Sequence, residues 1–133
     1  MQRNKYLDDL GIPITEYGTN FIGDNDERNK EWEKEREEYG FDNRETWCLD
    51  RILAEWMYSR FIMYKEVTIV NLDYHKYNID GKEWTQRECI DKIIENTKFY
   101  LCNETYAPDS TEVYEKLSEA IKIMSEVIFD MWW

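Results

Sequence analysis

The segment from residue 42 to residue 64 constrains the fold most, because its apolar residues recur three or four positions apart. This spacing places them on one face of a helix. Asp42 followed three residues later by Glu45 forms a capping box, which predicts the helix start. The stripe consists of Leu49, Ile52, Leu53, Trp56, Met57, Phe61 and Tyr64, widened by Trp47, Ile62 and Met63. We therefore expect a central helix that packs on more than one side.

Two further helices are predicted downstream, each opening on a capping box. Thr85 with Glu88 begins the first, and Asp109 with Glu112 begins the second. Each helix has one apolar face that is expected to point inward. These faces are Cys89, Ile90, Ile93, Ile94, Thr97 and Leu101 in the first helix, and Val113, Leu117, Ala120, Ile121, Met124 and Ile128 in the second.

A small β-hairpin is predicted between the central helix and the helix that begins at Thr85. Asp80-Gly81 is a strong hairpin turn signal, and it separates the short segments 74–79 and 82–84. No internal repeat or low-complexity linker interrupts the chain. The predicted fold class is therefore mainly α: a helical bundle of about four helices with a small inserted β-hairpin, forming a single domain over 1–133.

The N-terminal part differs from this core, which spans residues 42–133. Residues 1–23 contain scattered glycines and Pro13, and they predict an irregular arm. Residues 24–39 are almost wholly charged, with Trp32 and Tyr39 as their apolar members. This composition is typical of a solvated helix that rests on a few aromatic contacts. Gly40 follows it in the position where a helix often ends in a left-handed residue.

The charge balance excludes some classes of partner. The chain of 133 residues has 29 acidic and 17 basic residues, for a net charge of −12, yet 16% of its residues are aromatic. Such aromatic content argues for a folded protein rather than a disordered acidic segment. A domain this acidic repels phosphate, so we expect no direct nucleic-acid binding and no anionic membrane partner. The acidic excess is concentrated in residues 1–40 and 107–133.

The sequence offers little material for catalysis or for a cofactor. His75 is the single histidine, and no Gly-rich phosphate loop occurs. The three cysteines are widely spaced, which favours reduced, mostly buried thiols over a zinc site. Asp24-Asn25-Asp26 resembles the start of a calcium loop, but the glycine at its sixth position is missing. We expect no enzyme, no cofactor and no metal, and we interpret Asp50 as a buried structural carboxylate.

The acidic segment supplies the sharper functional hypothesis. Glu27, Glu31, Glu35 and Glu38 are spaced to form one continuous face of the predicted helix, with Asp24 and Asp26 preceding them. Carboxylates on a rigid helix can imitate a row of phosphates and compete for a basic groove. Simple solubility is the alternative interpretation of the same charges.

The C-terminal indoles also have two interpretations. Trp132 and Trp133 either close the bottom of the helical bundle or act as aromatic anchors for a partner, since tryptophan is enriched in interface hot spots. The first interpretation is the expected one.

Several motifs outside the acidic segment carry a resemblance to a known group, over residues 39–133. They are Tyr39-Gly40-Phe41, Glu45-Thr46-Trp47-Cys48-Leu49-Asp50, Gly81-Lys82-Glu83-Trp84-Thr85 and the Trp-rich terminus. In these the chain resembles small acidic accessory proteins encoded by phages and prophages of Gram-positive bacteria. The resemblance implies a phage accessory protein, and inhibition of a host defence system, as by anti-CRISPR proteins, is a common role for such proteins.

These observations combine into one leading function and two alternatives. The leading hypothesis is a non-enzymatic, phage-type inhibitor of a bacterial defence nuclease such as a CRISPR effector, whose basic groove the acidic surface occupies. We expect it in the cytoplasm of a bacterial host cell, because the N-terminus shows no secretory signal. One alternative is a sequestering binder of a nucleotide signal, with Arg44, Arg51 and Arg60 as its cationic wall and the tyrosines as its aromatic wall. The other is a purely protein–protein role.

Overall fold

A computed structural model describes residues 4–11, 27–103 and 111–133. The described chain is mainly α-helical with one small antiparallel sheet, which confirms the predicted fold class. Its contacts divide it into two units, Met1–Glu55 and Trp56–Trp133. Helix α3, Leu49–Val67, contributes residues to both units.

The first unit contains three short helical elements before α3: α1 at Lys5–Asp9, α2 at Asn29–Tyr39 and the 3₁₀ helix η1 at Asn43–Thr46. Gly40 ends α2 with a φ of 85°, as predicted. The charged helix expected over 24–39 begins only at Asn29 in the structure. Arg28 occupies its N-cap position without a capping side-chain bond, and Asp24 and Asp26 lie outside the described residues.

The predicted capping box at Asp42 starts a different element from the one expected. The Asp42 carboxylate accepts from the backbone N–H of Arg44 and so caps η1, whereas α3 begins at Leu49. The expected packing of α3 is also only partly right. Ala54, Met57 and Phe61 are buried, but Leu49, Trp56 and Met63 are exposed. Asp50 is exposed in the first turn of α3, so its interpretation as a buried carboxylate is wrong.

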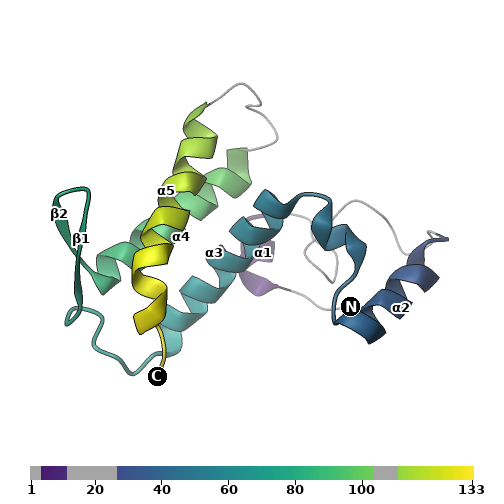
Figure 1. Ribbon diagram of the computed structural model, residues 1–133, viewed down its shortest axis with the longest axis horizontal. Coiled ribbons are helices and arrows are strands. Elements are labelled where there is room, and N and C mark those ends of the chain that lie inside the picture. Colours follow the sequence, from purple (N-terminus) through teal and green to yellow (C-terminus); the bar gives the residue numbers. More distant parts are fainter. Residues whose placement is uncertain (1–3, 12–26, 104–110) are drawn as a thin grey trace. The chain divides into compact units, whose positions relative to one another are not determined.

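The second unit is built on two antiparallel helices that lie side by side, α4 at Gln86–Asn103 and α5 at Thr111–Val127 (Figure 1). Val113, Leu117 and Ala120 are buried as predicted, together with Ile123 and Val127. Ile121 is 38% exposed, so its placement on the inner face is wrong. The buried residues Ile123 and Val127 lie one or two positions away from Ile121 and Ile128, which were expected to face inward. Asp109, the predicted cap of α5, lies outside the described residues.

The hairpin and its turn follow the prediction closely. Strand β1, Lys76–Ile79, pairs antiparallel with β2, Lys82–Thr85. Asp80 and Gly81 have φ values of 53° and 77°, the left-handed backbone that this two-residue turn requires. The capping box at the start of α4 is also confirmed. The Thr85 N–H donates to Glu88 Oε1, and the Glu88 N–H donates to Thr85 Oγ1, both at 3.1 Å.

Candidate protein-interaction surface

Helix α2 is held in the first unit by one buried indole. Trp32 is 1% exposed, and its Nε1 donates to Asn43 Oδ1 at 3.2 Å. The guanidinium carbon of Arg44 lies 4.4 Å from the centre of the indole, and that of Arg28 lies 5.0 Å from it. Trp47 meets the same indole edge-on at 6.0 Å. Cation–π and aromatic contacts of this kind supplement the burial of a large apolar ring.

A buried carboxylate completes this anchor. Asp42 is fully buried, and its two oxygens accept from the Arg44 side chain at 3.0 and 2.8 Å and from Arg36 at 3.0 Å. Burial raises the pKa of Asp42, but hydrogen bonds from Arg44 and Arg36 and the charge of Arg44 outweigh it, so the pKa lies below its ordinary value. The carboxylate therefore stays ionised and holds both arginines.

Glu35, one of the four glutamates predicted to face a partner, belongs to this anchor instead. Its Oε2 accepts from the backbone N–H of Asn43 at 2.6 Å, and its Oε1 accepts from Asn43 Nδ2 at 2.9 Å. The side chain is half-buried and ties α2 to η1. Its two carboxylate oxygens already bind within the protein, so Glu35 stabilises the helix that carries the other glutamates.

The remaining predicted glutamates face solvent. Glu31 and Glu38 are exposed on α2, and Glu27 is exposed in the turn that precedes it. Among the described residues, none of these three has an ion-pair partner. A second row, Glu33 and Glu37, is also exposed but lies on another side of the helix, because each residue advances about 100° around the axis. The structure thus leaves three of the four predicted glutamates exposed to solvent.

An exposed aromatic pair lies at the C-terminal end of this helix. The Tyr39 and Phe41 rings are 6.5 Å apart on either side of Gly40, and both are exposed. The left-handed turn at Gly40 positions them at the C-terminal end of α2. This end of the surface therefore combines carboxylates with apolar rings, a composition found at the anchored centre and polar rim of interfaces.

The C-terminal indoles are exposed, not packed at the bottom of a bundle as expected. Trp132 is 75% exposed and Trp133 is 62% exposed. The preceding 3₁₀ helix η2, Ile128–Asp130, is held by the Tyr77 hydroxyl, which donates to Asp130 Oδ2 at 2.7 Å. Beyond Asp130, both indole rings lie exposed to solvent. Their expected burial is wrong, and the anchor interpretation stays a prediction.

The candidate catalytic residues form no metal-binding cluster in the part of the chain that the structure describes. Within residues 4–11, 27–103 and 111–133, no three His, Cys, Asp or Glu side chains gather as a metal site requires. Burial and the charges of Glu88 and Glu126 raise the pKa of the Cys89 thiol to about 11, which leaves little thiolate at neutral pH. His75 is half-buried, with its ring edge-on to Tyr74.

The three arginines of the alternative nucleotide site each have a local partner. Arg44 binds Asp42, Arg51 pairs with Glu55 at 3.0 Å, and Arg60 donates to Ser59 Oγ at 3.1 Å. These local contacts, rather than a shared ligand pocket, account for their positions.

Sequence reasoning missed the buried polar residues. The sequence predicts Asp42 as a helix cap and Arg44 as part of a nucleotide site, and it assigns no role to Gln86 or Asn96. All four side chains are buried. The one signal for Asn96 is its position between Ile93 and Tyr100 on the inner face of α4.

Comparison with known proteins identifies no relative. No family model, no curated protein and no solved structure matches the chain. None of the helices in the described residues is both long enough and apolar enough to span a membrane.

Proposed function

We propose that this protein is a non-enzymatic, phage-type inhibitor of a bacterial defence nuclease, acting in the cytoplasm of the host cell as anti-CRISPR proteins do. The observation that carries the proposal is the exposure of Glu31 and Glu38 on α2 and of Glu27 in the turn before it, on a helix that buried contacts hold in place. A partner with a basic nucleic-acid groove, such as a CRISPR effector, is the chemistry that complements this surface.

The spacing of these carboxylates supports competition with nucleic acid. Glu31 and Glu38 are seven residues apart, which corresponds to about 10 Å along a helix axis. One DNA strand places about three phosphates along that length. The anchor formed by Trp32, Asp42 and Glu35 holds α2 in place, so little backbone freedom is lost on binding. The net charge of −12 would also steer the protein toward a basic groove.

The test is protection of a targeted phage in a CRISPR-immune Gram-positive host that expresses the protein. We expect phage plating to recover by orders of magnitude, and the purified protein to displace target DNA from the corresponding effector in a gel-shift assay. The triple variant Glu27→Lys, Glu31→Lys, Glu38→Lys should lose both activities with an unchanged helical circular dichroism spectrum. Glu35 is left intact, because reversing it would also damage the fold.

A matched control separates the surface from overall charge. The variant Glu33→Lys, Glu37→Lys, Glu115→Lys has the same change in net charge at exposed positions outside this row. It should retain most of the inhibition. Equal loss in both triple variants would show that net charge acts without a defined surface, and failure of the wild-type protein against every effector type tested would refute the proposed function.

The exposed C-terminal indoles favour a second candidate, a purely protein–protein role anchored by Trp132 and Trp133. Salt separates the two modes, because screening weakens a carboxylate-based interface much more than an aromatic one. Partner affinity that falls steeply between low and high salt supports the acidic surface. Affinity that is insensitive to salt but lost in Trp132→Ala supports the aromatic one.

A further inference from the structure

A groove between α4 and α5 contains a buried amide whose oxygen has no partner. The groove has a volume of about 430 Å³, at the lower end of the range of small-molecule sites. Asn96 lines it and is 0% exposed, and its Nδ2 donates to Glu119 Oε1 at 3.0 Å. Its Oδ1 accepts no hydrogen bond within the described residues. Buried amide oxygens are normally paired, so this one points to a donor supplied by a ligand.

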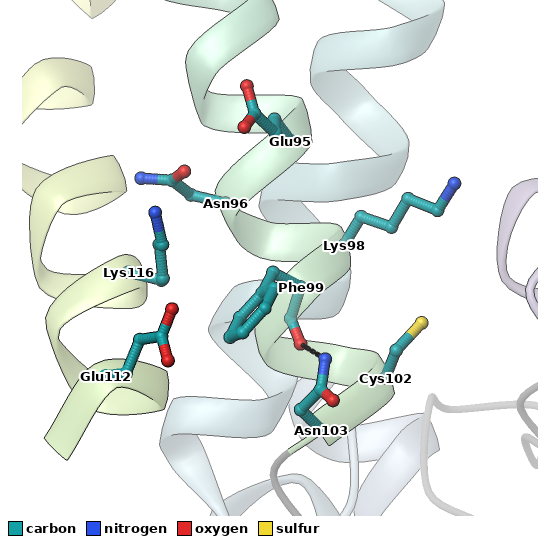
Figure 2. Close-up of a pocket in the computed structure, with 8 residues that line it drawn as sticks. All are labelled: Glu95, Asn96, Lys98, Phe99, Cys102, Asn103, Glu112 and Lys116. Carbon is teal, nitrogen blue, oxygen red and sulfur yellow. Dashed lines mark hydrogen bonds between the residues drawn. The ribbon is translucent and has the colours of Figure 1, made fainter. Parts of the chain in front are cut away.

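Three other side chains that matter to the proposal line the same groove: Phe99, Glu112 and Lys116. Figure 2 shows the Phe99 ring pointing from α4 toward α5, with Glu112 and Lys116 pointing back from α5. The Lys116 ammonium lies 5.9 Å from the centre of the Phe99 ring and points toward Asn96. The groove therefore combines an aromatic face, an acceptor at Asn96, a donor at Lys116 and a carboxylate at Glu112.

We propose that this groove binds a nucleoside whose base bears an exocyclic amine, with adenosine as the representative ligand. The amine donates to Asn96 Oδ1, and the adjacent ring nitrogen accepts from the Lys116 ammonium, because an amino-bearing base presents a donor beside an acceptor. The base stacks on Phe99, as bases do on aromatic side chains. Glu112 accepts from a ribose hydroxyl, the role that acidic residues have in dinucleotide sites.

The charges favour a nucleoside over a nucleotide. Lys116 and Glu112 balance each other in the groove, and the protein as a whole has a net charge of −12. A neutral ligand is not repelled by this field, whereas each added phosphate is. The site is separate from the acidic surface on α2, so this proposal stands or falls independently of the proposed inhibitory function.

Titration calorimetry of the wild-type protein with adenosine and inosine tests the proposal directly. Inosine replaces the amine with a carbonyl oxygen, which would face the oxygen of Asn96. We expect adenosine to bind at least tenfold more tightly than inosine. Equal affinity for the two nucleosides, or no binding of adenosine at millimolar concentration, would overturn the proposal. This comparison uses one intact protein, so it does not depend on the folding of any variant.

Matched variants locate the site. Phe99→Leu should lower the affinity for adenosine about tenfold through loss of stacking. Tyr114→Leu removes an exposed aromatic ring from the same helix pair outside the groove and should leave the affinity unchanged. Asn96→Leu should reduce the preference for adenosine over inosine. Adenosine binding that Phe99→Leu does not weaken would place the ligand elsewhere and contradict the assignment.

Discussion

The two units are stabilised in different ways. In the first unit, one indole, one buried carboxylate and the arginines around them form a set of directional contacts: Trp32 with Arg44, and Asp42 with Arg36 and Arg44. In the second unit, the α4–α5 pair buries apolar side chains at regular helical spacing, such as Ile90, Ile93, Leu117 and Ile123.

This difference predicts different sensitivities. Breaking one partner of a buried ion pair leaves an uncompensated charge, so the first unit should respond strongly to single polar substitutions. A close-packed apolar seam, such as the interface between α4 and α5, responds mainly to changes in side-chain volume. The acidic surface that we propose as functional is on the unit with directional contacts, where a rigid helix depends on few residues.

The largest expected effect is that of Asp42→Asn. This substitution keeps the size and the capping oxygen but removes the negative charge that compensates buried Arg44. We expect the first unit to lose about 3–5 kcal/mol of stability. Hydrogen exchange of the amides in residues 29–46 would measure the loss.

Asp73→Asn is the control for this substitution. Asp73 pairs with Arg87 at 3.0 Å, but both side chains are well exposed, so the expected cost is below about 1 kcal/mol. Equal costs for the two substitutions would show that the Asp42 cluster is not the anchor of α2.

Lowering the pH should destabilise the first unit in the same way as Asp42→Asn, because it protonates the Asp42 carboxylate. The pKa of Asp42 in the folded protein lies below its ordinary value of 3.8, so the folded state binds fewer protons than the unfolded state at that site. The stabilisation is therefore complete above about pH 4 and is lost as the pH falls through the lowered pKa. Asp42→Asn should lack this step when the exchange of residues 29–46 is followed between pH 5 and pH 2.

The elements that the sequence predicts well are those set by neighbouring residues. The Asp80-Gly81 turn and the Thr85–Glu88 capping box depend on backbone geometry over four residues, and both are present as expected. On α2, Glu31 and Glu38 are exposed on the side that their spacing predicts, whereas Glu35 binds within the protein.

The features that the sequence does not reveal depend on contacts between elements. Asp42 has the pattern of a helix cap, and only the approach of Arg36 from α2 makes it the centre of a buried cluster. On α5, the stripes through Ile121 and through Ile123 both have helical spacing, so periodicity alone does not decide which one faces α4. Asn96 interrupts an apolar face, and its surroundings between two helices are what suggest a site.

A smaller effect is expected from Tyr77→Phe, which tests whether the second unit also contains an important directional contact. Burial, followed by the hydrogen bond to Asp130 and its charge, raises the pKa of Tyr77, so the hydroxyl stays protonated and donates. Its loss should cost about 1.5 kcal/mol in urea unfolding, since the acceptor is charged. Tyr74→Phe, at an exposed ring, should cost nothing measurable. A comparable loss in both variants would argue against the role of Tyr77 in fixing η2.

The smallest effect concerns volume at the α4–α5 seam. Ile93 is fully buried, and Ile93→Val removes one methylene without adding a polar group, so we expect a loss of about 0.5–1.5 kcal/mol. Ile94 is only half-buried, and Ile94→Val should cost less in the same urea titration. A negligible cost for Ile93→Val would mean that the seam is loosely packed. The regular burial of its side chains would then not explain the stability of the second unit, and contacts such as Tyr77 with Asp130 would have to account for more of it.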